Sequence, residues 1–147
     1  MRTGFAVCCA IGCMMPLLIS CAANPPAFTP GPLGPCPDSP NCVSSVDPRD
    51  GHAVAPLGFE GDWTAARERL VALLSKMKRT KVVTVQAQYV HAECRSLIFR
   101  FVDDLEFYFV PGEKVIHIRS AARTGYSDFG VNRKRMEEIR RLWRDGK

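Results

Sequence analysis

The sequence predicts an α+β domain: a four-stranded antiparallel sheet with an N-terminal and a C-terminal helix packed on one face. Apolar residues recur at helical spacing near both ends of residues 36–147, and β-rich runs with short connections lie between them. Two amphipathic helices on one face of such a sheet would bury both apolar stripes. The chain has 147 residues, 46% hydrophobic and 24% charged, which fits one domain and excludes a disordered chain or a multi-span membrane protein.

Residues 1–20 have the features of a lipoprotein signal peptide. Arg2 supplies a basic start, a long apolar run follows, and no acidic residue occurs before Asp38. The end of this segment, Leu18-Ile19-Ser20-Cys21, resembles the bacterial lipobox, in which the cysteine thiol receives a diacylglycerol and the new N-terminus is acylated. The alternative is an uncleaved transmembrane anchor, for which the run is barely long enough. Both interpretations place the rest of the chain outside the cytoplasm.

Residues 21–35 are expected to form the lipidated cysteine and a proline-rich tether. Five prolines and two glycines in this segment disfavour helix and sheet interior and favour extended geometry. Ala22 follows the cysteine, and the absence of aspartate there favours the outer membrane over the inner one. We therefore expect an exported lipoprotein that faces the periplasm and contacts the membrane through its lipid anchor.

The formal net charge of the full chain is +5, from 20 basic and 15 acidic residues. This modest excess permits attraction to anionic surfaces but does not indicate a nucleic-acid-binding protein. The sequence contains no indication of an oligomeric state.

Three cysteines remain after Cys21. Cys36 and Cys42 close a short loop rich in proline, and in an exported protein such a pair is expected to form a disulfide. A metal site is the alternative, but the spacing is unusual for zinc and His52 is the only additional ligand nearby. Cys94 lies in an expected strand, where a buried, inert thiol is the most common state.

The elements of the domain are expected in a fixed order. Asp62 is a good N-cap for a helix over residues 63–78. Strands follow over residues 81–90, 91–102, 105–110 and 114–120. A second helix begins near residues 128–130, where Ser127 or Asp128 can cap it.

The side-chain alternation predicts the hairpin between the two middle strands. Leu97, Phe99 and Phe101 share one sheet face with Leu105 and Phe107 only if the turn holds an odd number of residues or a bulge. We therefore expect a three-residue or bulged turn at Asp103-Asp104. The opposite face would then gather the polar side chains of Arg100, Glu106 and Tyr108.

Charged residues around this turn and in a downstream loop form the main polar cluster. Three segments carry the pattern: Cys36–Ser45, Phe101–Phe107 and Ile118–Arg135. Together they resemble the bacterial family called domain of unknown function 1499, and the likeness covers about residues 36–143. The resemblance implies an exported or membrane-attached protein, and it implies no catalytic residue, because no activity is established for the family.

The cluster has three interpretations. It can be an ion-pair network that locks a hairpin, a loop and the last helix together, with Arg119, Arg123 and Arg133 on the nearby carboxylates. It can be an anion-binding pocket built from a helix N-terminus and arginines. It can be a catalytic site with a carboxylate as general base. The candidate residues are Asp103, Asp104, Glu106, Arg119, Ser120, Arg123, Tyr126, Ser127, Asp128, Asn132 and Arg133.

The leading functional expectation is a non-enzymatic envelope lipoprotein that binds a small anionic ligand or an envelope protein. No nucleophile–base pair is identifiable, and no cofactor or metal site is expected, because His52, His91 and His117 lack metal-ligand spacing. The alternative is an envelope hydrolase or transferase that uses Asp103, Asp104 or Glu106 with Arg119 and Arg123.

Overall fold

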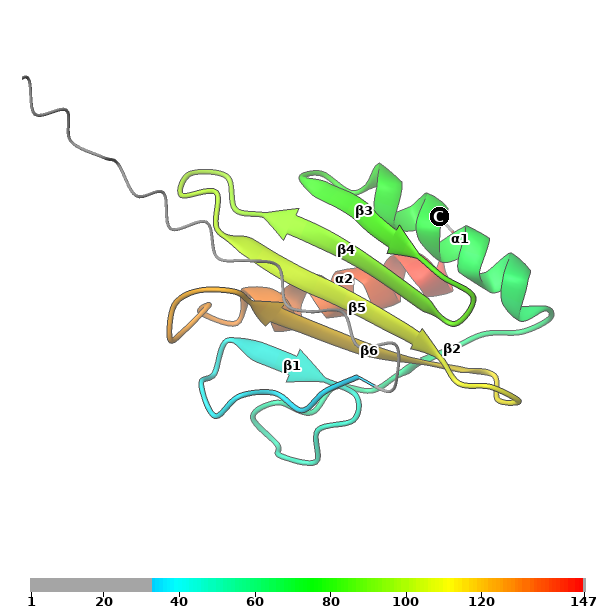
Figure 1. Cartoon of the computed structure of the whole chain (residues 1–147), viewed down its shortest axis with the longest axis horizontal. Coiled ribbons are helices and arrows are strands. Elements are labelled where there is room, and N and C mark those ends of the chain that lie inside the picture. Colours follow the sequence, from blue (N-terminus) through cyan, green and yellow to red (C-terminus); the bar gives the residue numbers. More distant parts are fainter. Residues whose placement is uncertain (1–32, 147) are drawn as a thin grey trace, which may run out of the picture.

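The computed structural model describes residues 33–146, which form an α+β domain with one antiparallel sheet and two helices (Figure 1). In chain order the elements are β1 Cys42–Ser44, β2 Leu57–Gly58, α1 Trp63–Lys76, β3 Thr80–Val85, β4 Tyr89–Arg95, β5 Val102–Phe109, β6 Val115–Ala122 and α2 Val131–Arg144. The α+β class and the antiparallel sheet are confirmed, but the expectation of four strands is wrong, because the sheet has six.

The two additional strands are short segments that pair with β6. The strand order is β1-β6-β5-β4-β3, and β2 pairs with β6 as well. β1 lies beside the end of β6 and β2 beside its beginning. With three and two residues, respectively, β1 and β2 are too short to show the alternation that identifies a strand in a sequence.

The apolar core joins one face of the sheet to both helices. Strand pairing places Val90 opposite Phe107 and Phe107 opposite Ile118, so these side chains share a face. The same buried cluster contains residues of α1 and α2: Leu70, Leu73, Leu74, Met136, Ile139 and Trp143. α1 contacts β3 and β4, and α2 contacts β6 and β1; Figure 1 shows α2 behind the sheet and α1 alongside β3.

The helix N-termini are held by aspartates. Asp62 accepts hydrogen bonds from the backbone N–H groups of Thr64 at 2.8 Å and Ala65 at 3.1 Å, which confirms the cap predicted for α1. At α2 the N-cap is Gly130, whose φ of 76° lies in the left-handed region that favours glycine. Asp128 still accepts from the backbone N–H of Asn132 at 2.7 Å, so its side chain satisfies a free donor of the first turn.

The expected turn at Asp103-Asp104 is wrong. β4 ends at Arg95, and residues 96–101 form the hairpin loop, closed by a hydrogen bond from the Ser96 backbone N–H to the Phe101 carbonyl at 2.9 Å. Asp103 and Asp104 lie inside β5, where they pair with Cys94 and Glu93. Leu97, Phe99 and Phe101 therefore do not share a sheet face with Leu105 and Phe107, because they lie in the loop with exposed side chains, and Arg100 lies there with them.

The disulfide between Cys36 and Cys42 is confirmed, with a Cα–Cα distance of 5.6 Å. Closing so short a ring contributes about 2 kcal/mol in the chain-entropy account. His52 does not join these sulfurs in a metal site: its Nδ1 lies 2.9 Å from the backbone carbonyl of Cys42. Cys94 is a buried free thiol, as expected.

The expected signal peptide and Cys21 lie outside the described residues, as does most of the expected tether. Leu33, in the last part of the tether, is buried. Within residues 33–146, neither helix has the length and apolar character needed to span a bilayer.

Candidate functional site

The candidate residues of the polar cluster divide between the two faces of the sheet. Alternation along β5 sends Asp103 toward α2 and Asp104 toward the face without helices. We call the group on the helix-free face the outer network, which consists of Tyr89, His91, Glu93, Asp104, Glu106, Arg119 and Arg123. We call the group against α2 the inner network, which consists of Asn41, Asp103, Ser120, Asn132 and Arg135.

Arg123 is the centre of the outer network. Its guanidinium donates to both carboxylate oxygens of Asp104, at 2.9 and 2.7 Å, and to Glu93 at 2.7 Å. His91 lies with Nε2 2.7 Å from Oδ1 of Asp104. The side chain of Asp104 is only 6% exposed, so each of its oxygens has replaced water by a protein donor.

Arg119 holds the second carboxylate of this face. It forms an ion pair with Glu106, which stands directly across from it in the β5–β6 ladder. The hydroxyl of Tyr89 donates to Oε1 of Glu106 at 2.8 Å. Burial, reinforced by the charge of Glu106, raises the pKa of Tyr89, so the phenol stays protonated and remains a donor. Nε of Arg119 is buried without a hydrogen-bond partner in the described part of the chain.

The acidic groups around Arg123 are ionised at neutral pH. Burial works to raise the pKa of Asp104, but the hydrogen bonds from His91 and Arg123 outweigh it, and the pKa lies below its ordinary value. For Glu93, burial also opposes ionisation, and Arg123 and Arg95 together bring the pKa below its ordinary value. The pKa of Arg123 is raised in turn by its hydrogen bonds to Asp104 and Glu93.

The inner network ties β5 and β6 to α2 and to the segment before β1. Arg135 donates to Asp103 at 2.7 Å and to the side-chain oxygen of Asn132 at 2.7 Å. Asn132 is fully buried; it accepts from the hydroxyl of Ser120 and donates to the backbone carbonyl of Asn41 at 3.0 Å. Burial raises the pKa of Asp103 above its ordinary value despite the neighbouring Arg135.

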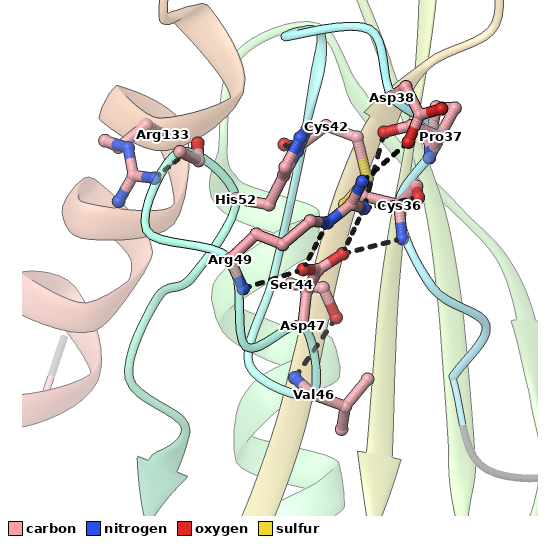
Figure 2. A network of polar contacts seen from close by, with 11 residues as sticks. Cys36, Pro37, Asp38, Cys42, Ser44, Val46, Asp47, Arg49, His52 and Arg133 are labelled. Atoms are coloured by element: carbon pink, nitrogen blue, oxygen red, sulfur yellow. Dashed lines mark hydrogen bonds and ion pairs between the residues drawn. A yellow bond between two sulfur atoms is a disulfide. The ribbon is translucent and has the colours of Figure 1, made fainter.

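Within residues 33–146, Arg133 forms no ion pair with a carboxylate, contrary to the ion-pair interpretation. It donates to the backbone carbonyls of Ala53 at 2.8 Å and Gly51 at 3.0 Å, and so anchors the loop before β2 to α2 (Figure 2). Helical periodicity separates it from Arg135, which faces the sheet two positions later. Asp128 serves the start of α2 rather than an arginine.

The remaining two candidates lie in the loop between β6 and α2. The Ser127 hydroxyl accepts from the backbone N–H of Phe129 at 3.2 Å, which stabilises the loop locally. Tyr126 is highly exposed, and its side chain makes no contact that ties it to either network. The structure therefore brings neither residue to the paired carboxylates.

A third network, around Asp47, holds the disulfide loop (Figure 2). Asp47 accepts from Nε of Arg49 at 2.9 Å and from the backbone N–H of Cys36 at 3.2 Å. Arg49 also donates to the carbonyl of Cys36 at 2.7 Å and to Asp38 at 2.8 Å. The hydrogen bond from Arg49 holds the pKa of Asp47 far below its ordinary value. No sequence motif marks Asp47 and Arg49 as a pair.

Cationic side chains gather at one end of the sheet, around a surface pocket of about 390 Å³. We call this feature the basic pocket and define it by Lys78, Arg79, Arg95 and Lys134. Arg95 pairs with Glu93 at 3.1 Å, whereas the other three form no ion pair within residues 33–146. Arg135 and Asp103 also line the pocket but neutralise each other, and Glu138 is the one additional acid. The pocket therefore carries an excess of positive charge.

The described residues contain no group of three or more His, Cys, Asp or Glu side chains arranged to hold a metal ion. The chemistry that the arrangement offers is charge recognition. The carboxylates of both networks are engaged by arginine, histidine or tyrosine, and cations outnumber acids among the charged groups of the basic pocket that form no ion pair.

The chain belongs to a family whose members have no established function. The family described as "Protein of unknown function (DUF1499)" matches residues 32–142, which includes all the strands and most of α2. This match shows the family that the resemblance indicated. No curated protein matches the chain.

Replacing Arg123 by glutamine should lower the free energy of unfolding by about 3 kcal/mol, because R123Q removes the guanidinium that pairs with the buried Asp104 and the half-buried Glu93. Chemical denaturation followed by circular dichroism measures the change. The matched control is R95Q, which removes an exposed arginine from the same Glu93 and should cost less than about 1 kcal/mol. Equal losses for the two variants would contradict the central role of Arg123.

Acid should destabilise the wild type more steeply than D104N. A carboxyl whose folded pKa is lowered stabilises the fold above its unfolded pKa, about 3.9, and loses that contribution as pH falls through the folded value. D104N removes this contribution. D103N should have the opposite effect. Because the folded pKa of Asp103 is raised, protonation of this carboxyl favours the folded state above about pH 4. D103N removes that favourable contribution, so the free energy of unfolding should fall more steeply with acid in this variant. Urea unfolding at stepped pH from 6 to 2 measures the slopes, and matching slopes for both variants would contradict the assignment.

Proposed function

We propose that this protein is a non-enzymatic, membrane-anchored envelope lipoprotein whose domain binds a small anionic ligand at the basic pocket. The observation that carries the proposal is the distribution of partners among the charged groups. The carboxylates of both networks are bound by cationic or hydroxyl side chains. Lys78, Arg79 and Lys134 line the basic pocket, and none of these three forms an ion pair in the described part of the chain.

The partner distribution argues against an anion site at Arg119 and Arg123. A ligand phosphate or carboxylate would have to displace Glu106 from Arg119, or Asp104 and Glu93 from Arg123. Such a displacement leaves a buried carboxylate without a partner, which is costly. Lys78, Arg79 and Lys134 are exposed to solvent, so an anion can bind these three cations without breaking an existing ion pair.

Anchoring rests on the N-terminal sequence. The lipobox-like segment ending at Cys21 supports export and acylation, and the disulfide between Cys36 and Cys42 agrees with folding in an oxidising compartment. Two or three acyl chains hold a protein at a membrane far more firmly than one.

The alternative function is an envelope hydrolase or transferase, and one observation favours it. Asp103 lines the basic pocket, and burial raises its pKa, as a general acid or base requires. Against it, Asp103 is already bound by Arg135 at 2.7 Å. The hydroxyl of Ser120 is buried and bound to Asn132, so it is not available as a nucleophile. Binding is therefore the better-supported role.

Inorganic phosphate should bind at the basic pocket. In an NMR titration of the full chain carrying Cys21→Ser, we expect the largest amide shifts at Lys78, Arg79 and Lys134. The double variant K78Q/K134Q should weaken binding at least about fivefold, because each lost cation removes a charge-assisted contact. The matched control, R141Q/R144Q, removes the same charge from the other end of α2 and should bind like the parent. Shifts centred on Arg119 and Arg123 would contradict this location.

The mature protein should begin at Cys21 and carry a diacylglycerol and an N-terminal acyl chain. Mass spectrometry of protein extracted from the membrane fraction measures both. The variant C21S should keep an unacylated N-terminus and shift toward the soluble fraction. An intact, unmodified N-terminus on the wild-type chain would contradict the anchor without affecting the binding site.

A further inference from the structure

Most of the exposed large apolar side chains lie in two loops. Seven of the eleven within residues 33–146 occur between β4 and β5 or between β6 and the start of α2. Their exposed fractions run from 46% to 89%. We call this group the apolar tip; its members are Leu97, Ile98, Phe99, Phe101, Tyr126, Phe129 and Val131. Exposed apolar side chains scattered singly are ordinary, but such a concentration marks an interaction surface.

Strand pairing brings the two loops to the same end of the sheet. Arg95 ends β4 opposite Val102 at the start of β5, and Ala122 ends β6 opposite Asp103. The backbone N–H of Arg123 donates to the carbonyl of Val102 at 3.0 Å, which joins the roots of the two loops. Figure 1 shows both loops leaving the sheet at one end.

The hairpin loop is ordered by its own contacts rather than loosely attached. The Ser96 hydroxyl accepts from the backbone N–H of Phe101 at 2.9 Å, and the rings of Phe99 and Phe101 stack with centroids 5.5 Å apart. Arg100 has a φ of 54°. The loop therefore has a defined shape that holds apolar side chains outside the core.

Backbone strain is concentrated at this end. The non-glycine residues with positive φ in the described chain are Arg79, Arg100 and Phe129. One lines the basic pocket and the other two lie in the loops of the apolar tip. Such conformations are unfavourable for residues with a side chain and are common where a surface is held ready for binding.

The apolar tip adjoins the basic pocket directly. Leu97 and Val131 belong to the tip and also line the pocket, beside Lys78, Arg95 and Lys134. Bulky apolar side chains at projecting loops, bordered by cations, match the chemistry of a bilayer interface with acyl chains beneath anionic headgroups.

We infer that the apolar tip docks on a phospholipid bilayer, with an anionic headgroup phosphate in the basic pocket. This inference rests on the proposed function, because it names the class of ligand that the pocket binds. Leu97, Ile98 and Phe99 enter the interfacial region, and Lys78 and Lys134 contact phosphates. The chain from Cys21 to Leu33 spans at most about 40 Å, comparable to the width of a domain of this size, so a lipidated Cys21 permits the tip to reach the same membrane.

The test places a fluorophore at the apolar tip of the full-length protein, which keeps Cys21 and its lipid anchor. Phe99→Cys and Glu113→Cys, each labelled with the environment-sensitive dye NBD, are reconstituted in vesicles with 30% phosphatidylglycerol in phosphatidylcholine. Glu113 is exposed and lies in the β5–β6 turn at the opposite end of the sheet. Because both proteins carry the same anchor, anchorage alone cannot produce a difference between them.

We expect a blue shift and strong quenching by doxyl-labelled lipids for the Phe99 label, and neither for the Glu113 label. Pure phosphatidylcholine should weaken the effect severalfold, as should K78Q/K134Q, whereas R141Q/R144Q should not. In the Cys21→Ser background, L97S/I98S/F99S should lower partitioning into anionic vesicles at least about tenfold, with unchanged circular dichroism.

Four results would overturn the inference. Identical spectra for the two labels would show that the apolar tip stays in water. If phosphate still binds the basic pocket in that case, the proposed function stands and docking on the bilayer is excluded. A blue shift without vesicles that grows with protein concentration would identify a second copy of the chain as the occupant. Equal quenching in anionic and neutral vesicles would show that the basic pocket does not bind an anionic headgroup. Loss of both phosphate binding and quenching would overturn the proposed function as well.

Discussion

The structure depends on one constraint: carboxylates built into the middle of a sheet must be neutralised where they lie. Asp104 is placed in the central strand β5 and is almost fully buried, so water cannot stabilise its charge. Arg123 from the end of β6 and His91 from β4 supply the donors, and Glu93 shares the same guanidinium. The pairing thus crosses three strands, and a one-residue slip of any of them would separate the partners and expose their charges to an apolar face.

The same alternation gives the sheet two different faces. One face is apolar and joins the helices in a continuous core, whereas the other carries the outer network. Asp103 is a charged residue on the apolar, helix-covered face, and Arg135 from α2 neutralises its charge there. An ion pair as well as apolar packing therefore attaches α2 to the sheet. Together with the disulfide loop around Asp47, these contacts make a rigid scaffold whose loops are positioned by well-defined strand ends.

This organisation separates structural charge from available charge. The buried ion pairs stabilise the register and leave no carboxylate or guanidinium of the sheet free for a ligand, since any ligand would have to replace an internal partner. The free cations and the exposed apolar side chains instead lie together at one end of the sheet. A domain with such an end is suited to recognise an anionic, partly apolar surface, which is the role that the proposals assign to it.

Much of this protein could be predicted from local patterns. The α+β class, both helices, the Asp62 cap and the disulfide follow from spacing, capping and composition, because each depends on residues close in the chain. The family was indicated by the resemblance of three separate motifs. The strand pairing at Asp103, the partners Glu93, His91 and Arg135, and the exposure of Leu97 to Phe101 were decided by tertiary structure. Alternation alone cannot distinguish an apolar run that enters the core from one that lies in a projecting loop. Only the register of β4 against β5, set by buried side chains from distant segments, determined where the hairpin turns and which arginine meets which carboxylate.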